Sequence, residues 1–562
     1  MTATMPTEPP NYPHCGRGAG DRDPVGCRGR RVERRTGETG DSQPELYAAC
    51  LTHLADEDRD TYLASLGPGS RLDHRGTTIG GTVLDRLLGA VRDPDTGRPR
   101  LGTSQFSGAV FESDAAFDGA IFEGHAQFSN ATFNRSVSFA WGIFQGEARF
   151  SGAIFASEAA FIEAAFKDDV WFSNAFFKAN AWFGGATFEQ ASKIGPLVCH
   201  GQADFQTAVF STAVTLEIAA KKVDCLRVRW ASTAALRLRH ATVDLSDAVL
   251  EYPVSVAASS TPFTVVRQEL DGSWARQELD ESGLTRSPVR VLSLRGVDAS
   301  HLVLADVDLA LCRFAGTIHL DQLRLQGRCT LATTPAGLRR RGVVPVRCTV
   351  RQTLAEEQHW RAAQGRAGEG WTPDPDGGEP LTPTTLAPVY RELRKAFEDG
   401  KNEPGAADFY YGEMEMRRHD PHTSWSERFL LQVYWTVSGY GLRAARALSW
   451  LLAAMAATVL LMMLWGLPQE SPKSVNTGII EGRRITVITD TPTPMNPHGP
   501  YLDRLSSERF EPALRVVINS VVFRSSGQNL TTFGTYTEMA SRFTEPLLLA
   551  LAVLAIRSRV KR

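Results

Sequence analysis

The sequence carries almost no net charge, and it lacks the patterns that identify many enzymes and metal proteins. Its 61 basic and 63 acidic residues give a formal charge of −2, so no general attraction to nucleic acid and no nucleic-acid partner are expected. The eight cysteines include no C-x-x-C pair and no zinc-type spacing, so no metal site is predicted. Scattered single thiols are typical of a reducing cytoplasm. The N-terminal residues contain no apolar run of the kind found in secretory signals.

Catalytic arrangements are also lacking. His419 and His422 flank a turn without further ligands nearby, which is usual for solvated histidines. Glu356, Glu357 and His359 fall on one predicted helix, where a charged surface is a simpler interpretation than an acid–base pair. We therefore expect no enzymatic activity and no cofactor.

What the sequence does have is phenylalanine at alternating steps of five and six residues, so that the repeat is eleven residues long. Neither the period of a helix nor that of a strand fits this spacing. A small residue, mostly alanine, precedes each Phe by two places, and Gly, Asn or Ser often follows it. Such a period indicates a solenoid with stacked units and Phe rings in internal ladders. The predicted core rings are Phe106, Phe111, Phe117, Phe122, Phe128, Phe133, Phe139, Phe144, Phe150, Phe155, Phe161, Phe166, Phe172, Phe177, Phe183 and Phe188.

The repeat unit resembles the motif of the pentapeptide-repeat superfamily, in which a small residue, a polar residue and a central Leu or Phe precede two variable positions. Its five–six alternation is similar to the Phe-centred variant of that family. The resemblance implies a β-solenoid, a right-handed four-sided β-helix, over residues 104–188. The register continues to Leu216 and breaks at Lys221-Lys222, and a second block runs from Leu294 to Leu331 with inward companions such as Cys312 and Ile318.

The chain is long enough for several domains. We predict a disordered basic N-terminus (1–43), a helical cap (44–100), the repeat solenoid (101–250), an irregular insertion (251–290), a second repeat block (291–335), a linker with a short helix (336–385), a helical connector (386–440), a first transmembrane helix (441–467), an extracytoplasmic loop (468–512), and a final segment (513–562). The final segment holds a short re-entrant-like helix, a second transmembrane helix and a basic tail. The cap is expected because an open end of a solenoid exposes apolar rings and strand edges.

Two segments near the C-terminus favour a multi-pass protein of the cell membrane. Residues 447–467 are apolar and uncharged, about the ~20 residues that cross a bilayer. The second span, ending at residue 556, has enough length only if it includes Glu538, Arg542 and Glu545, which we expect to pair along the helix or to lie at the interface. Basic residues before the first span and in the tail place both the solenoid and the C-terminal tail in the cytoplasm.

The segments next to the first span, 409–418 and 439–443, are similar to those of bacterial membrane-anchored pentapeptide-repeat proteins. We expect a non-enzymatic scaffold whose partners are the lipid bilayer and an unknown cytoplasmic protein. The Ser424-x-x-Glu427 capping box begins a helix that is a candidate for lying along the membrane surface.

Two other functions were weighed. Residues 525–536 partly resemble the filter of two-span cation channels, although the second filter glycine is missing. This alternative is a pore with a regulatory solenoid, formed by a homo-oligomer and lined by Asn529, Thr531, Thr532, Gly534 and Tyr536. Residues 101–190 contain more acidic than basic residues, which is similar to family members that mimic DNA and protect topoisomerases. A membrane tether disfavours that function.

Overall fold

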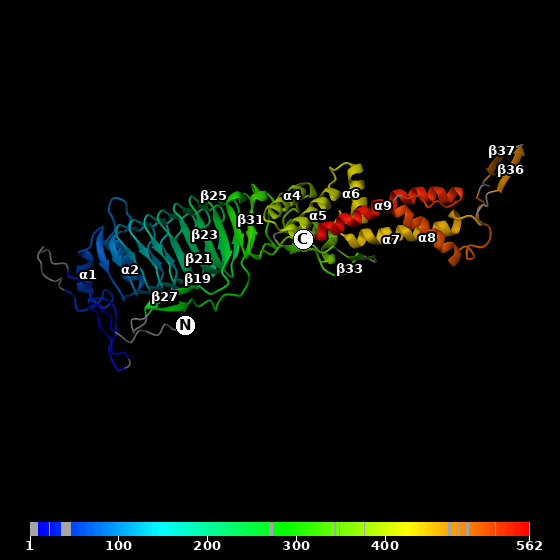
Figure 1. The fold of residues 1–562 in the computed structure, drawn as a ribbon. Helices are drawn as coiled ribbons and strands as arrows, with labels where there is room; N and C mark the ends of the chain where they lie inside the picture. The colour runs from blue at the N-terminus through cyan, green and yellow to red at the C-terminus, as the bar shows by residue number, and fades with distance from the viewer. Residues whose placement is uncertain are drawn as a thin grey trace. The chain divides into compact units, whose positions relative to one another are not determined.

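The computed structural model describes residues 9–21, 23–34, 46–268, 274–341, 344–347, 349–375, 377–469, 475–481, 484–490, 494–522 and 524–560. The chain divides into two compact units, Met1–Asn402 and Glu403–Arg562. The first unit holds the solenoid with its two ends, and the second unit holds helices α5 to α9 (Figure 1).

The first unit is built on a parallel β-solenoid of about 10 turns over residues 100–326, which confirms the predicted fold class. One of its sheets contains β1 (Ser70–Asp73), β3 (Arg100–Gln105), β6 (Ile121–Phe122), β7 (Ala126–Gln127), β10 (Ile143–Phe144), β11 (Ala148–Arg149), β14 (Ala165–Phe166), β15 (Val170–Trp171), β18 (Thr187–Phe188), β20 (Val209–Phe210), β22 (Arg229–Trp230) and β25 (Val249–Leu250). The other contains β2 (Thr78–Ile79), β4 (Val110–Phe111), β5 (Ala115–Ala116), β8 (Thr132–Phe133), β9 (Val137–Ser138), β12 (Ile154–Phe155), β13 (Ala159–Ala160), β16 (Phe176–Phe177), β17 (Ala181–Trp182), β19 (Lys193–Asp204), β21 (Val214–Asp224), β23 (Ala234–Arg239), β24 (Thr242–Asp244), β26 (Val254–Ala258), β29 (Arg290–Ser293), β30 (Leu302–Ala305) and β31 (Arg324–Gln326).

The strand pairing explains why the sequence repeats every eleven residues. Phe111 in β4 lies opposite Phe133 in β8, and Phe122 in β6 lies opposite Phe144 in β10, so that one coil is two repeats long. Each coil between Phe106 and Phe188 therefore places four Phe rings inside, and rings from successive coils stack nearly parallel. Their centroids are 5.2 Å apart for Phe106–Phe128, 4.7 Å for Phe111–Phe133, 5.0 Å for Phe117–Phe139 and 4.7 Å for Phe122–Phe144. All sixteen rings named above are at most 1 % exposed.

The eleven-residue register changes near Lys221-Lys222, as expected, and the solenoid continues through this point. Ile194 pairs with Leu216, whereas Lys222 pairs with Thr242, so the coil shortens from 22 to 20 residues. β21 includes both Lys221 and Lys222, and its neighbour β24 pairs with it at Lys222. The lysines are compatible with the strand because they do not enter the core: Lys221 is exposed, and the ammonium group of Lys222 lies 2.7 Å from the Asp224 carboxylate. The inward position expected for Ile318 in the second block is also wrong, since this side chain is 50 % exposed.

The predicted insertion is shorter than expected, because β26 (Val254–Ala258) is still part of a coil and pairs with β23 and β30. Beyond it, β27 (Thr264–Gln268) and β28 (Trp274–Glu278) form an antiparallel hairpin. Phe263, Leu279 and Leu284 around this hairpin pack against Val198 and Ala219 on the solenoid.

The N-terminal end of the solenoid carries α1 (Asp56–Ala64) and α2 (Gly81–Ala90), whose Leu84, Leu87 and Leu88 are buried. Disorder over residues 1–43 was expected, but residues 9–21 and 23–34 are folded: His14 forms an antiparallel bridge with Arg30, and Glu33 forms one with Leu46. The composition suggested disorder because it gives no sign of contacts between residues that are far apart in the sequence. Residues 1–8, 22 and 35–43 of the same prediction lie outside the described residues.

At the other end of the solenoid, β32 (Ala332–Thr333) pairs with β35 (Gln352–Thr353), and β33 (Leu338–Arg341) forms a hairpin with β34 (Val344–Arg347). Helices α3 (Ala355–Arg361) and α4 (Pro383–Asp399) complete this unit.

The second unit contains α5 (Glu403–His419), α6 (Trp425–Ser438), α7 (Ala444–Leu461), the antiparallel strands β36 (Val475–Glu481) and β37 (Arg484–Asp490), α8 (Ser507–Val521) and α9 (Thr532–Val560). Half of the predicted capping box forms at the start of α6: the Glu427 N–H donates to the Ser424 hydroxyl over 3.3 Å, whereas the Glu427 carboxylate pairs with Arg417. A wider helical turn, Met462–Gly466, extends α7. Among the described residues, two helical stretches are long and apolar enough to cross a membrane, Ala444–Gly466 and Thr532–Arg557.

Candidate functional site

Glu356, Glu357 and His359 do not form the charged surface that the sequence suggested, because all three side chains are buried in α3. The Glu356 carboxylate accepts hydrogen bonds from the backbone N–H groups of Phe314 (2.6 Å) and Ala315 (2.9 Å) in the last coils. Burial raises the pKa of Glu356, although these two hydrogen bonds oppose the shift. Helix α3 therefore closes the C-terminal end of the solenoid.

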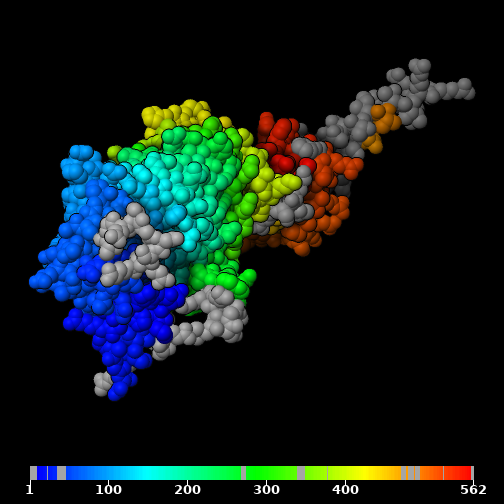
Figure 2. Space-filling view, turned by 90° about the vertical axis from the view of Figure 1, so that its left-hand side faces the viewer, coloured from blue at the N-terminus to red at the C-terminus, as the bar shows by residue number. Residues whose placement is uncertain are grey.

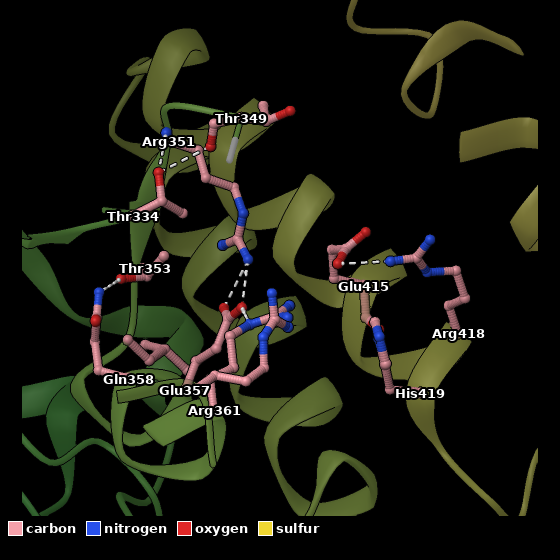
Figure 3. Close-up of polar contacts among 12 residues, drawn as sticks. Thr334, Thr349, Arg351, Thr353, Glu357, Gln358, Arg361, Glu415, Arg418 and His419 are labelled. Atoms are coloured by element: carbon pink, nitrogen blue, oxygen red, sulfur yellow. Dashed lines mark hydrogen bonds and ion pairs between the residues drawn. The ribbon is translucent and has the colours of Figure 1, made fainter. Parts of the chain in front are cut away.

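Glu357 lies between two guanidinium groups (Figure 3). Its carboxylate is 2.6 Å from Arg351 Nη2 and 2.6 Å from Arg361 Nε, and it also accepts a hydrogen bond from the Tyr390 hydroxyl on α4. Burial opposes ionisation, but the two arginines outweigh it and lower the pKa of Glu357 to about 2. A carboxylate held in this way is a fixed anion that joins α3, α4 and Arg351 just before β35, rather than a base poised near neutral pH.

Polar side chains around this ion pair fix the strands next to it (Figure 3). The Thr334 hydroxyl accepts a hydrogen bond from the Arg351 N–H over 3.2 Å and donates to the Thr349 carbonyl over 2.8 Å. The Gln358 amide donates to the Thr353 hydroxyl over 2.9 Å. Sequence reasoning missed this network because its members come from separate segments and share no spacing pattern.

The histidines of the 419–422 turn have different surroundings, both in the second unit. The His419 ring lies 2.8 Å from the Glu415 carbonyl, one helical turn earlier, while the Arg418 guanidinium pairs with the Glu415 carboxylate over 3.0 Å (Figure 3). His422 is exposed. This geometry suits a helix terminus and a solvated turn.

The apolar helices α7 and α9 pack antiparallel. The Thr531 hydroxyl just before α9 donates to the Trp465 carbonyl over 2.7 Å at the end of α7, whereas Thr458, earlier in α7, donates to the Glu545 carboxylate over 2.9 Å. Gly534 lies so close to Gly466 that a Cβ at position 534 would be 2.8 Å from the Gly466 Cα. The two glycines let the helices meet where their backbones cross.

The charged residues of the second span meet the expectation in part: Glu538 and Arg542 pair along the helix, whereas Glu545 is buried against another helix. Arg542 pairs with Glu538 one turn earlier over 2.9 Å, and the buried Glu545 faces Thr458 of α7. Helix α8 adds an apolar contact, with Ala513, Val516 and Val517 packed against the end of α7.

The residues proposed to line a pore do not form one extended loop. Thr532, Gly534 and Tyr536 lie in the first turns of α9, and the Gly534 N–H donates to the Thr531 hydroxyl over 3.1 Å. Tyr536 and Asn529 are exposed. A filter of extended-backbone carbonyls is therefore absent from this described segment, because the helix begins at Thr532; pore lining in a homo-oligomer stays a prediction.

The outer surface of the solenoid is mostly polar, and its exposed apolar side chains include one neighbouring pair. Trp141 is 56 % exposed and Ile162 is 39 % exposed, and they lie side by side because the Trp141 N–H donates to the Ile162 carbonyl over 2.8 Å. The Arg98 guanidinium donates to the carbonyls of Gly119 and Trp141, both over 2.6 Å, which fixes this corner.

Comparison with known proteins agrees with the ladder geometry. Residues 100–140, 117–164 and 143–187 match the family model described as pentapeptide repeats (9 copies). These stretches coincide with the Phe ladders, so residues 100–187 of the solenoid consist of pentapeptide repeats, as the sequence predicted. Such a solenoid is typically a structural or protein-interaction fold. No curated protein and no solved structure matches the chain.

Proposed function

We propose that this protein is a membrane-tethered scaffold, in which the solenoid offers a rigid protein-binding surface and the C-terminal helices hold it at the bilayer. The observation that carries the proposal is the joining, in one chain, of a pentapeptide-repeat solenoid to a pair of helices with the length and apolar character of membrane spans. The Phe ladders fill the solenoid interior, so binding takes place on its outside.

The outer surface of the helical pair supports insertion into lipid. Large apolar side chains point away from the α7–α9 contact and are exposed, which is costly in water and favourable in hydrocarbon. They include Leu448, Leu452, Leu460, Phe543, Leu547, Val553 and Leu554.

Helix α6 supports contact with the membrane surface. Trp425, Phe429, Leu430 and Val433 are all exposed, and the rings of Trp425 and Phe429 stack with centroids 5.7 Å apart. A helix with one exposed face of aromatic and aliphatic residues is suited to the interface between headgroups and acyl chains.

The antiparallel packing of α7 and α9 supports a topology with both ends on one side. Arg443 and Arg446 begin α7, and Arg557 lies near the end of α9, so basic residues gather at the same end of the pair. Because basic flanks stay in the cytoplasm, we assign the solenoid and the C-terminal tail to that side and residues 468–512 to the other.

The scaffold proposal is tested in cells with the full-length, affinity-tagged chain. We expect the same protein to be recovered repeatedly with the parent, and its recovery to fall about tenfold with a Trp141→Ala/Ile162→Ala double variant, roughly the effect of losing 1.4 kcal/mol of binding. Tyr252→Ala, an exposed aromatic elsewhere on the solenoid, is the matched control. Recovery of no specific protein with the parent would contradict the scaffold, and unchanged recovery with the double variant would exclude this corner.

A further inference from the structure

Three cysteines and one histidine that are far apart in the sequence meet at the N-terminal end of the first unit. The ligand atoms of Cys15, Cys27, Cys50 and His53 all lie within 4.8 Å of one another. His53 Nδ1 is 3.4 Å from Cys50 Sγ and 3.6 Å from Cys15 Sγ, and Cys27 Sγ is 3.8 Å from Cys50 Sγ.

These three distances match the edges of a tetrahedron of zinc ligands, and the other three separations are no longer than 4.8 Å. With Zn–S bonds of about 2.3 Å and Zn–N bonds of about 2.0–2.1 Å, two ligand sulfurs are separated by about 3.8 Å and a sulfur and a nitrogen by about 3.5 Å. A disulfide between Cys27 and Cys50 requires a sulfur separation of about 2.05 Å, far below the 3.8 Å observed.

We propose that Cys15, Cys27, Cys50 and His53 bind one Zn²⁺ ion. Four protein ligands leave no position for water or substrate, which defines a structural rather than a catalytic site. No metal was predicted because the cysteines are not paired in the sequence; the signal for the site is Cys50-x-x-His53 together with two single upstream cysteines.

The backbone holds the four side chains in place. Cys15 and Cys27 lie on facing arms of a hairpin, where the Cys15 N–H donates to the Gly29 carbonyl and the Gly16 N–H donates to the Cys27 carbonyl, both over 2.8 Å. The His53 N–H donates to the Cys50 carbonyl over 2.9 Å, and this turn brings the last two ligands together. A Cβ at position 29 would lie 2.8 Å from the Cys50 Cβ, so the close approach of the two segments requires glycine.

Zinc binds thiolates rather than thiols, so the three cysteines release their protons when the ion binds.

The position of the cluster indicates what the ion does. The Arg30 N–H donates to the Arg75 carbonyl over 2.8 Å, and the Arg30 guanidinium pairs with Asp73 over 3.1 Å at the end of β1. Strand β1 is paired with β3 of the first coil, and the N-terminal segment, dark blue in Figure 2, lies beside these coils. Zinc therefore fastens residues 9–21, 23–34 and 46–54 to the N-terminal end of the solenoid, where a cap is required.

The test is the metal content of the purified full-length protein in detergent. We expect about one zinc per chain, and loss of most of it in Cys27→Ser and His53→Ala. Cys329→Ser, a half-buried cysteine outside the cluster, is the matched control and keeps the zinc. Cobalt substituted for zinc gives the charge-transfer and d–d bands of a tetrahedral thiolate site, and both bands weaken in Cys15→Ser.

A second readout does not depend on any variant folding. Removing the metal from the parent with a chelator exposes residues 9–21, 23–34 and 46–54 to protease, and adding zinc back restores protection, because the binding energy of a structural zinc is folding energy. Parent protein without bound zinc or a tetrahedral cobalt spectrum overturns the proposal. So does a peptide map in which Cys27 and Cys50 are joined by a disulfide in protein prepared under reducing conditions.

Discussion

Truncating a single ring in the middle of the solenoid tests the ladder directly. Phe144 is fully buried and lies between Phe122, with centroids 4.7 Å apart, and Phe166, 4.8 Å apart. Phe144→Ala removes the ring and leaves a cavity between two coils that cannot close without shifting the backbone. The expected loss is about 3–5 kcal/mol of stability.

Hydrogen exchange measures this loss locally, because the other parts of the chain open independently. For amides in strands that open only with the coils around Phe144, exchange should accelerate by roughly a hundredfold to a few thousandfold, since each 1.4 kcal/mol is a factor of ten. Ile162→Ala on the outer surface is the control, with an expected change of about 0.5 kcal/mol or less. Equal exchange in the two variants would refute the inward ladder. Phe144→Asp, which also buries an unpaired charge, should unfold several coils.

Three further predictions concern the closed end of the solenoid and the helical pair. Glu357→Gln leaves Arg351 buried without its anion and should lower the free energy of unfolding by about 3–5 kcal/mol, measured as a lower melting temperature. The control is Arg515→Ala, which breaks an exposed ion pair with Glu511 and should change the melting temperature little. The pKa of Glu357 falls from its ordinary 4.5 to about 2 on folding, so its stabilising contribution is complete above about pH 4.5 and is lost as the pH falls toward 2. The pKa of Glu356 is raised on folding, so its contribution to stability has the opposite sign and is lost as the pH rises. Acid melting of parent and Glu357→Gln should therefore converge. Gly534→Val should separate α9 from α7, measured as loss of a cysteine crosslink between the helix ends; an unchanged crosslink would contradict the close approach of Gly466 and Gly534.

The pore hypothesis is tested by measuring ion conductance. Single-channel recording of the purified full-length protein in planar bilayers, beside Gly534→Asp, would support a pore if the variant abolished conductance. We expect no conductance from either protein, because the stretch that resembles a filter enters α9 at Thr532.

The repeat could be predicted from the sequence because the core residues of a solenoid recur at regular intervals along the chain. Phe106 and Phe128, for example, occupy the same position in successive coils. Which single residues the coils accept at irregular positions could not be predicted from the sequence. Lys222 remains in its strand because Asp224 is beside it, and Ile318 points outward although its step fits the pattern. Periodicity gives the register of the chain but not the direction of each side chain at an irregular coil.

The polar sites depended on contacts between distant segments. Glu357 can be buried because Arg351 and Arg361 each lie 2.6 Å from its carboxylate. The sequence of helix α3 by itself suggested a charged, solvent-exposed surface. Cys15 and Cys27 reach Cys50 only when residues 9–34 fold back on the first coil, which a basic, glycine-rich composition did not suggest. Pairing of Glu538 with Arg542 was foreseeable, because both lie on one helix at a spacing of four.

The central claim, a solenoid held at the cytoplasmic face of a membrane by two spans, is tested most directly by protease protection of the full-length protein in oriented membrane vesicles. The account predicts that the protein stays in the membrane after an alkaline wash. It also predicts that protease removes the solenoid and the C-terminal tail only when the cytoplasmic face is outward, and cleaves within 468–512 only from the opposite face. Release of the protein by the wash, or digestion of the solenoid from the opposite face, would contradict it.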